Sequence, residues 1–229
     1  MKKIIVAIDG FSSCGKSTLS RGLAKKLGYK FIDTGAMYRA VALYLLDHHI
    51  DYHDVAVVEH ALHDIHIEFE YNPSREASDT LLNGVNIEDE IRDMRVANIV
   101  SHVSSISAVR RFLVKQQQKM GEKRGIVMDG RDIGTVVFPD AELKIFLTAD
   151  EQIRAHRRQN ELADKGQRLT YEEVLKNLHD RDLIDTTRED SPLKKADDAL
   201  LLDNSDIGKD EQLNLAYKWA MNRINQASA

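Results

Sequence analysis

A glycine-rich loop near the N-terminus limits the folds that this chain can adopt. Residues 10–17, GFSSCGKS, match the pattern G-x-x-x-x-G-K-[ST], which forms a phosphate-binding loop when it follows a strand and opens a helix. The apolar, β-branched run at residues 4–8 predicts the strand. Leu19, Leu23 and Leu27 predict one apolar helical face. An ordinary glycine turn before a helix is the weaker alternative.

The residue types in this loop suit a phosphate ligand. Successive backbone N–H groups can form an anion-binding nest, and the helix N-terminus adds further donors with a partial positive charge. Gly10 and Gly15 allow the tight turns. Lys16 offers a positive charge to the β- and γ-phosphates, and Ser17 offers a hydroxyl to Mg²⁺.

Length and charge exclude several classes of protein. The 229 residues are enough for one sizeable domain with insertions or for two small domains. A net charge of −5 argues against general nucleic-acid binding, and the single cysteine excludes an intramolecular disulfide framework. No apolar run has membrane-spanning length, and the N-terminus enters a strand without a signal peptide. We expect a cytoplasmic protein with no nucleic-acid or membrane partner.

Alternating strands and helices predict the fold class. Two strand–helix units, at residues 3–27 and 30–48, indicate an α/β fold with a parallel sheet. Three later apolar runs predict further strands, and the segments between them predict helices. The strands are expected at 125–129, 143–147 and 200–203, and the helices at 108–120, 151–163, 170–182 and 211–225, with a capping box at Thr170.

One segment breaks this rhythm. Apolar and polar residues alternate over 65–71, which predicts a half-exposed strand. The polar residues 72–80 predict a turn, and Asn83-Gly84 between two short apolar runs predicts a hairpin. We therefore expect an inserted antiparallel subdomain at about 62–92.

Carboxylates follow two of the predicted strands. Asp129 ends an apolar strand and begins a sequence with three charged residues in four, at the sheet edge where ligands bind in open α/β folds. Such a carboxylate lies near Mg²⁺ in phosphate-loop enzymes. Capping of the following turn is the alternative role. Asp9, at the end of the first strand, is interpreted as structural.

Arginines are the next signal, because guanidinium groups pair with phosphate oxygens and remain charged at physiological pH. Phosphoryl transfer requires mainly positioning and charge neutralisation. A surface ion pair is the alternative for any one arginine, most of all for Arg154 and Arg157. Cys14 lacks a visible partner base, so we expect no catalytic or redox role, and the scattered histidines lack the spacing of a zinc site. The candidate phosphate-binding arginines are Arg39, Arg131, Arg181 and Arg188, with Arg154, Arg157 and Arg158 on one helix.

Four segments together resemble a known family. GFSSCGKST (10–18), DTGAMYRAVAL (33–43), DGRDIGTVVFPDAELKIFL (129–147) and AHRRQNEL (155–162) are similar to the bacterial cytidylate kinases, type 1 nucleoside monophosphate kinases with a P-loop. The resemblance runs nearly end to end. It implies one P-loop kinase domain, 1–229, with a core (1–61, 93–153 and 169–229), a nucleoside-monophosphate-binding insertion (about 62–92) and a lid (about 154–168).

The resemblance also implies roles for individual residues. Family members often have proline and alanine where this chain has Phe11 and Cys14. Lys16, Asp129, Arg131 and Arg188 would be catalytic, and Ser17 with Asp129 would position Mg²⁺. ATP would be held by Gly10, Phe11, Ser12, Ser13, Cys14, Gly15, Lys16, Ser17 and Thr18, with Arg157 and Arg158 from the lid. The acceptor nucleotide would face Thr34, Tyr38 and Arg39, and its base would contact Ser101, Arg110 and Asp132. Arg131, Arg181 and Arg188 would surround the acceptor phosphate and the transferred phosphoryl group. Asp185 would hold the sugar hydroxyls.

These residue types favour cytosine over uracil. Asp132 can accept from the amino group of cytosine, while Arg110 and Ser101 can donate to N3 and O2. Uracil reverses the first two polarities, which would leave buried groups unpaired at roughly 1–3 kcal/mol each. The expected activity is transfer of the γ-phosphoryl group of ATP to CMP or dCMP in pyrimidine nucleotide metabolism, by a monomer. The alternatives are a kinase for UMP or shikimate, or a nucleotide-dependent switch, for which we find no N-K-x-D segment.

Overall fold

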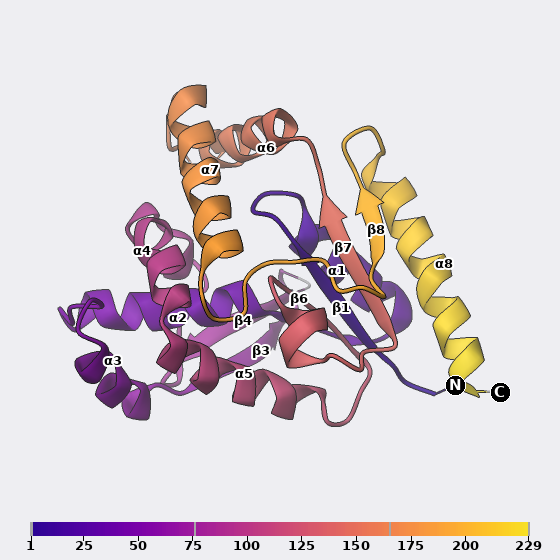
Figure 1. The fold of residues 1–229 in the computed structure, drawn as a ribbon, viewed down its shortest axis with the longest axis horizontal. Coiled ribbons are helices and arrows are strands. Elements are labelled where there is room, and N and C mark those ends of the chain that lie inside the picture. Colours follow the sequence, from indigo (N-terminus) through magenta and orange to yellow (C-terminus); the bar gives the residue numbers. More distant parts are fainter. Residues whose placement is uncertain (1, 76, 165, 229) are drawn as a thin grey trace. The chain divides into compact units, whose positions relative to one another are not determined.

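The computed structural model describes residues 2–75, 77–164 and 166–228 (Figure 1). Its chain forms two compact units. The first, which we call the core unit, consists of Met1–Ile32 and Lys123–Ala229, and the second, the inserted unit, is Asp33–Glu122. The chain therefore leaves the core unit after its second strand and returns to it ninety residues later.

The core unit is built on a five-stranded parallel sheet with the order β2-β6-β1-β7-β8. Strand β1 lies in the centre, pairing with β6 on one side and β7 on the other, and all six of its residues are buried. This explains its continuous apolar sequence, because a central parallel strand is covered on both faces. The strands are β1 (Ile5–Gly10), β2 (Lys30–Asp33), β6 (Ile126–Gly130), β7 (Leu143–Thr148) and β8 (Leu200–Asp203).

The helix after the loop and the C-terminal helix pack on this sheet. Leu19 and Leu23, from the helix after the loop, join Val6 and Ile8 of β1 in one apolar cluster, to which the C-terminal helix contributes Ala220. A five-residue π-helical turn, Ile133–Val137, follows β6. The helices are α1 (Lys16–Leu27), α6 (Glu151–Asp164), α7 (Tyr171–Thr187) and α8 (Lys209–Ser228).

The inserted unit combines four helices with a small antiparallel sheet. Strands β3 (Ile67–Asn72), β4 (Ala77–Leu82) and β5 (Val85–Asn86) pair in sequence order. Short 3₁₀ turns occupy Leu62–Asp64 and Glu90–Arg92. The helices are α2 (Thr34–Asp47), α3 (Val55–Ala61), α4 (Met94–Ser105) and α5 (Ser107–Gly121).

The structure confirms the α/β fold class and the predicted hairpin. Leu82 pairs with Val85, and the two residues between them, Asn83 and Gly84, have φ values of 51° and 80°, as a two-residue hairpin loop requires. The capping box at Thr170 is present in full. The bounds of the predicted insertion and lid remain a prediction, and Glu76 and Lys165, which fall inside them, lie outside the described residues.

The predicted turn over residues 72–80 is wrong in its second half, because β4 already begins at Ala77. Asp79 and Thr80 are polar yet buried in this strand. Asp79 accepts hydrogen bonds from the side-chain amides of Asn72 and Asn86, at 2.7 and 2.9 Å. Thr80 is likewise bonded to the carboxylate of Glu88. Polar partners at the ends of the neighbouring strands, Asn72 and Asn86, and in the segment after β5, Glu88, thus allow polar residues inside the sheet.

Candidate functional site

The loop between β1 and α1 has the backbone of a phosphate nest. A Cβ on Gly10 would lie only 2.0 Å from the carbonyl oxygen of Leu147, so only glycine fits at this close approach. Ser13 and Gly15 have positive φ values of 58° and 88°. Left-handed residues that alternate with ordinary ones direct successive N–H groups to one concave side. The loop therefore has an anion-binding shape before any ligand is bound.

Lys16, the first residue of α1, is buried at the end of this loop. Its Nζ donates to the carbonyl oxygen of Phe11 at 2.6 Å and lies 3.8 Å from Cys14 Sγ. Burial, and then the charge of Arg131, lower the pKa of Lys16, against the opposing charge of Asp129. A buried ammonium without a carboxylate in its hydrogen bonds is suited to an anionic ligand.

Ser17 and Asp129, the predicted metal residues, are in contact. Ser17 Oγ donates to Asp129 Oδ2 at 2.7 Å. Asp129 lies on β6 beside Ile8 of β1, which brings its carboxylate near the loop that follows β1. Within the described ranges no three His, Cys, Asp or Glu side chains form a metal cluster. A hydroxyl and one carboxylate nevertheless fit Mg²⁺, which keeps several waters and is held by few protein oxygens together with substrate phosphates.

The arginines and Asp185 of the predicted site form one cluster. Arg131 Nε donates to Asp185 at 2.7 Å, and Arg188 Nη1 lies 3.4 Å from the other carboxylate oxygen. Burial alone would raise the pKa of Asp185, but the charges of Arg131 and Arg188 outweigh it and hold the pKa below its ordinary value. Arg181 Nε is buried and has no hydrogen-bond partner among the described residues. Burial and the charge of Arg131 lower the pKa of Arg181 to about 10.

The arginines of the predicted lid differ from one another. Arg154 is buried and donates from Nη1 to the carbonyl oxygen of Ser12 at 3.1 Å and to Asp182 at 2.5 Å. Arg157 donates to both the side-chain and backbone oxygens of Asn204, each at 2.9 Å. Arg158 pairs with Glu161, three residues later on the same helix. The sequence analysis missed Asp182 and Asn204, and only the proximity of Asp182 to the candidate Arg181 could have indicated it.

The structure gives Asp9, which the sequence suggested to be structural, a specific role. Its two carboxylate oxygens accept from the backbone N–H groups of Ile133 and Gly134, both at 2.7 Å. It thereby connects the end of β1 to the π-helical turn that follows Arg131 and Asp132. Burial raises the pKa of Asp9 from 3.8 to about 6 in spite of these two hydrogen bonds.

The inserted unit contains three residues predicted to face the acceptor nucleotide, Thr34, Tyr38 and Arg39. Asp33 caps α2 by accepting from Ala36 N at 2.9 Å, and the charges of Arg92 and Arg39 overcome burial to lower its pKa. Thr34, the next residue, is buried in the first turn of α2. Arg39 therefore lies close to the start of that helix.

The predicted base-reading arginine is also in the inserted unit. Arg110 is 2% exposed, stacks over Tyr38 at 5.5 Å from the ring centre and donates to the carbonyl oxygen of Ser104 at 3.1 Å. Ser101 is buried on α4, one turn before Ser104. Asp132 belongs to the core unit, so the proximity of the three base-reading residues stays a prediction.

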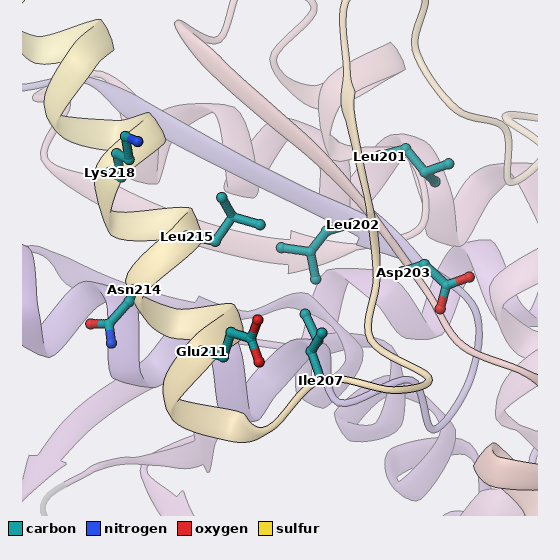
Figure 2. Close-up of a pocket in the computed structure, with 8 residues that line it drawn as sticks. All are labelled: Leu201, Leu202, Asp203, Ile207, Glu211, Asn214, Leu215 and Lys218. Carbon is teal, nitrogen blue, oxygen red and sulfur yellow. The ribbon is translucent and has the colours of Figure 1, made fainter.

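A groove of about 520 Å³ lies elsewhere in the core unit, between β8 and α8 (Figure 2). Figure 2 shows the apolar side chains of Leu202, Ile207 and Leu215 facing its interior. It contains no predicted site residue. Its lining consists of Leu201, Leu202, Asp203, Ile207, Glu211, Asn214, Leu215 and Lys218.

Known proteins match this chain over nearly its whole length. The family model described as cytidylate kinase matches residues 6–221. The chain is 57% identical to a protein named cytidylate kinase from Parabacteroides distasonis and 55% identical to one from Bacteroides fragilis, with 99% of each chain covered. A solved structure of an uncharacterized protein from Eubacterium ventriosum shares the fold at a TM-score of 0.52 and 12% identity, over 96% of this chain and 99% of that one. None of the described helices combines the length and apolar character needed to cross a membrane. The chain belongs to the cytidylate kinase family.

Proposed function

We propose that this protein transfers the γ-phosphoryl group of ATP to CMP or dCMP, giving CDP or dCDP and ADP, with Mg²⁺. The observation that carries the proposal is a preformed phosphate loop with Lys16 and the Ser17–Asp129 pair, in a chain of the cytidylate kinase family. The reaction would belong to cytoplasmic pyrimidine nucleotide metabolism.

The donor side follows from the loop. ATP would place its phosphates against the loop amides, and Lys16 would exchange the neutral carbonyl of Phe11 for a charged phosphate oxygen. Ser17 and Asp129 would hold Mg²⁺, directly or through water. Such an ion neutralises charge on the β- and γ-phosphates.

The arginine cluster supports the transfer step. In phosphoryl transfer, charge spreads over the migrating group, so the protein contributes mainly fixed positive charge and alignment. Asp185 already orients Arg131 and Arg188. Arg181 remains protonated at neutral pH with its pKa near 10, and an anion near its buried Nε would relieve the cost of that charge.

Acceptor choice would depend on Arg110, Ser101 and Asp132. Both Arg110 and Asp132 are buried, so a base with the wrong pattern would set donor against donor at Arg110 and acceptor against acceptor at Asp132. A site of this kind discriminates strongly without an editing step. We expect Arg110→Met to weaken the preference for CMP over UMP more than it weakens ATP binding.

An ADP-release assay across the common nucleoside monophosphates and shikimate tests the proposal. CMP and dCMP should stimulate ADP release most, and Lys16→Ala should abolish this stimulation while the circular dichroism spectrum remains that of the wild type. Stimulation by UMP or shikimate alone would identify a different kinase. Slow hydrolysis that no acceptor accelerates would indicate a nucleotide-dependent switch.

A further inference from the structure

Every polar group of Ser12 is engaged by the protein. Its backbone N–H donates to Asp182 Oδ1 at 3.3 Å, and its carbonyl oxygen accepts from Arg154 at 3.1 Å. Its hydroxyl accepts from Arg131 Nη2 at 2.9 Å. The N–H of Ser12 is thus directed to a carboxylate of α7, and the residues that follow it in the loop are left to bind phosphate.

The next residue, Ser13, adopts a conformation that it would not choose by itself. A left-handed φ of 58° costs a residue with a Cβ roughly 1–2 kcal/mol. The residues on both sides of Ser13 are fixed: Ser12 by Asp182 and Arg154, and Cys14 through its carbonyl oxygen, which accepts from Asn204 at 2.8 Å. These contacts hold Ser13 in the left-handed conformation that shapes the nest.

Arg154 and Asp182 form a rigid support for this part of the loop. They pair at 2.5 Å and their side chains are only 7% and 13% exposed. Arg154 also donates from Nε to the carbonyl oxygen of Ala149 and lies 5.3 Å from the ring centre of Phe11. Its Nε and Nη1 groups are therefore directed at the protein, and Nη1 supports the loop at Ser12.

We propose that Asp182, together with Arg154, is a positioning residue that preorganises the phosphate nest for ATP by fixing Ser12. This inference depends on the proposed function in that ATP is the ligand of the loop. Helices α6 and α7 are thereby linked to donor binding, since one carries Arg154 and the other Asp182.

The replacement Asp182→Asn tests the inference with little change in shape. An amide oxygen can accept from Ser12 or from Arg154, but it has no charge, and its NH₂ group opposes the remaining donor. Ser13 should then leave the left-handed conformation in most molecules. If about one molecule in ten keeps the competent loop, the apparent Kd rises about tenfold, since affinity falls with the competent fraction.

We expect equilibrium titration with a fluorescent ATP analogue, without acceptor, to show this tenfold rise. The KM for CMP should stay within about twofold of the wild-type value. The kcat at saturating ATP should also stay near the wild-type value, because bound phosphate restores the loop. Asp180→Asn is the matched control, since Asp180 is an exposed carboxylate on the same helix. A purely structural role would lower the melting temperature or the active fraction without changing Kd.

An unchanged Kd in folded Asp182→Asn would overturn the inference. If that variant does not fold, Arg154→Lys serves instead, because lysine keeps the charge but cannot reach Ser12, Asp182 and Ala149 together. It should raise Kd by at least about threefold, and a wild-type Kd would again refute the inference. Wild-type protein that binds the analogue but produces no CDP would refute the proposed function alone.

Discussion

The buried carboxylate of Asp9 should make the stability of the core unit depend on pH. In the folded protein its pKa is about 6, against an ordinary value of 3.8, and burial is the main cause, with the charge of Asp132 adding to it. The folded protein therefore holds this proton over a pH range in which the unfolded chain has released it. The contribution of Asp9 to stability is greatest below pH 3.8 and declines as the pH rises to about 6.

The size of the effect follows from the same two values. Each pKa unit is worth about 1.36 kcal/mol, so ionised Asp9 costs the folded state about 3 kcal/mol. Asp9→Asn removes this cost. It loses in return one of the two acceptors for Ile133 and Gly134, and a buried N–H left without a partner costs about 1–3 kcal/mol. The net difference in unfolding free energy between Asp9→Asn and the wild type is thus small near neutral pH, but this difference depends strongly on pH.

Urea unfolding of wild type and variant at several pH values measures this dependence, with the single tryptophan, Trp219 on α8, as the probe of the core unit. Between pH 4 and 7.5 the difference in unfolding free energy should move by about 2 kcal/mol in favour of Asp9→Asn. Asp203→Asn is the control, because Asp203 is exposed and the hydrogen bonds of Ser205 lower its pKa. Parallel pH profiles for wild type and Asp9→Asn would refute the reasoning.

Three further substitutions have defined expected results. Gly10→Ala should give protein without detectable ATP binding by titration, because its Cβ would collide with the carbonyl of Leu147. Thr170→Ala removes the acceptor that its hydroxyl offers to the backbone N–H of Glu173 and should cost about 1 kcal/mol in urea unfolding. Arg92→Met removes the ion pairs of Arg92 with Asp33 and Glu88 and should cost about 2 kcal/mol in urea unfolding. This is less than for a fully buried pair, because Arg92 is partly exposed. A wild-type affinity or unfolding midpoint in any of these variants would contradict its explanation.

Local patterns predicted the sheet and the loop. The run at residues 143–147 falls within β7, and the run at 4–8 begins one residue before β1, because buried parallel strands carry an unbroken apolar sequence. The residues of the phosphate-binding loop could be identified because the loop is formed by contacts between residues close in the sequence, which fixes their spacing. Helix α3, Val55–Ala61, had no such signal, since its three valines favour strands and only packing decides the outcome.

The supports of the site could not be predicted in the same way. Asp182 contacts a residue 170 positions earlier, and Asn204 contacts one 190 positions earlier. Neither belongs to a motif with fixed spacing, and a carboxylate on a charged helix is usually a solvated one. Arg154 was placed among the weakest candidates for the phosphate site, and the structure shows its donors engaged by loop, helix and backbone instead.

Phe11 and Cys14, where the resemblance led us to expect proline and alanine, are in contact with each other. Cys14 Sγ donates to the carbonyl oxygen of Phe11 at 3.0 Å, the same oxygen that accepts from Lys16. The ring of Phe11 packs edge-on against Phe146 of β7, with 5.9 Å between ring centres, and Arg154 lies over it. Phe11 thus supplies apolar packing and a cation–π contact beneath the loop, which a proline at position 11 would lack. Through its carbonyl oxygen the same residue also holds Lys16 and Cys14.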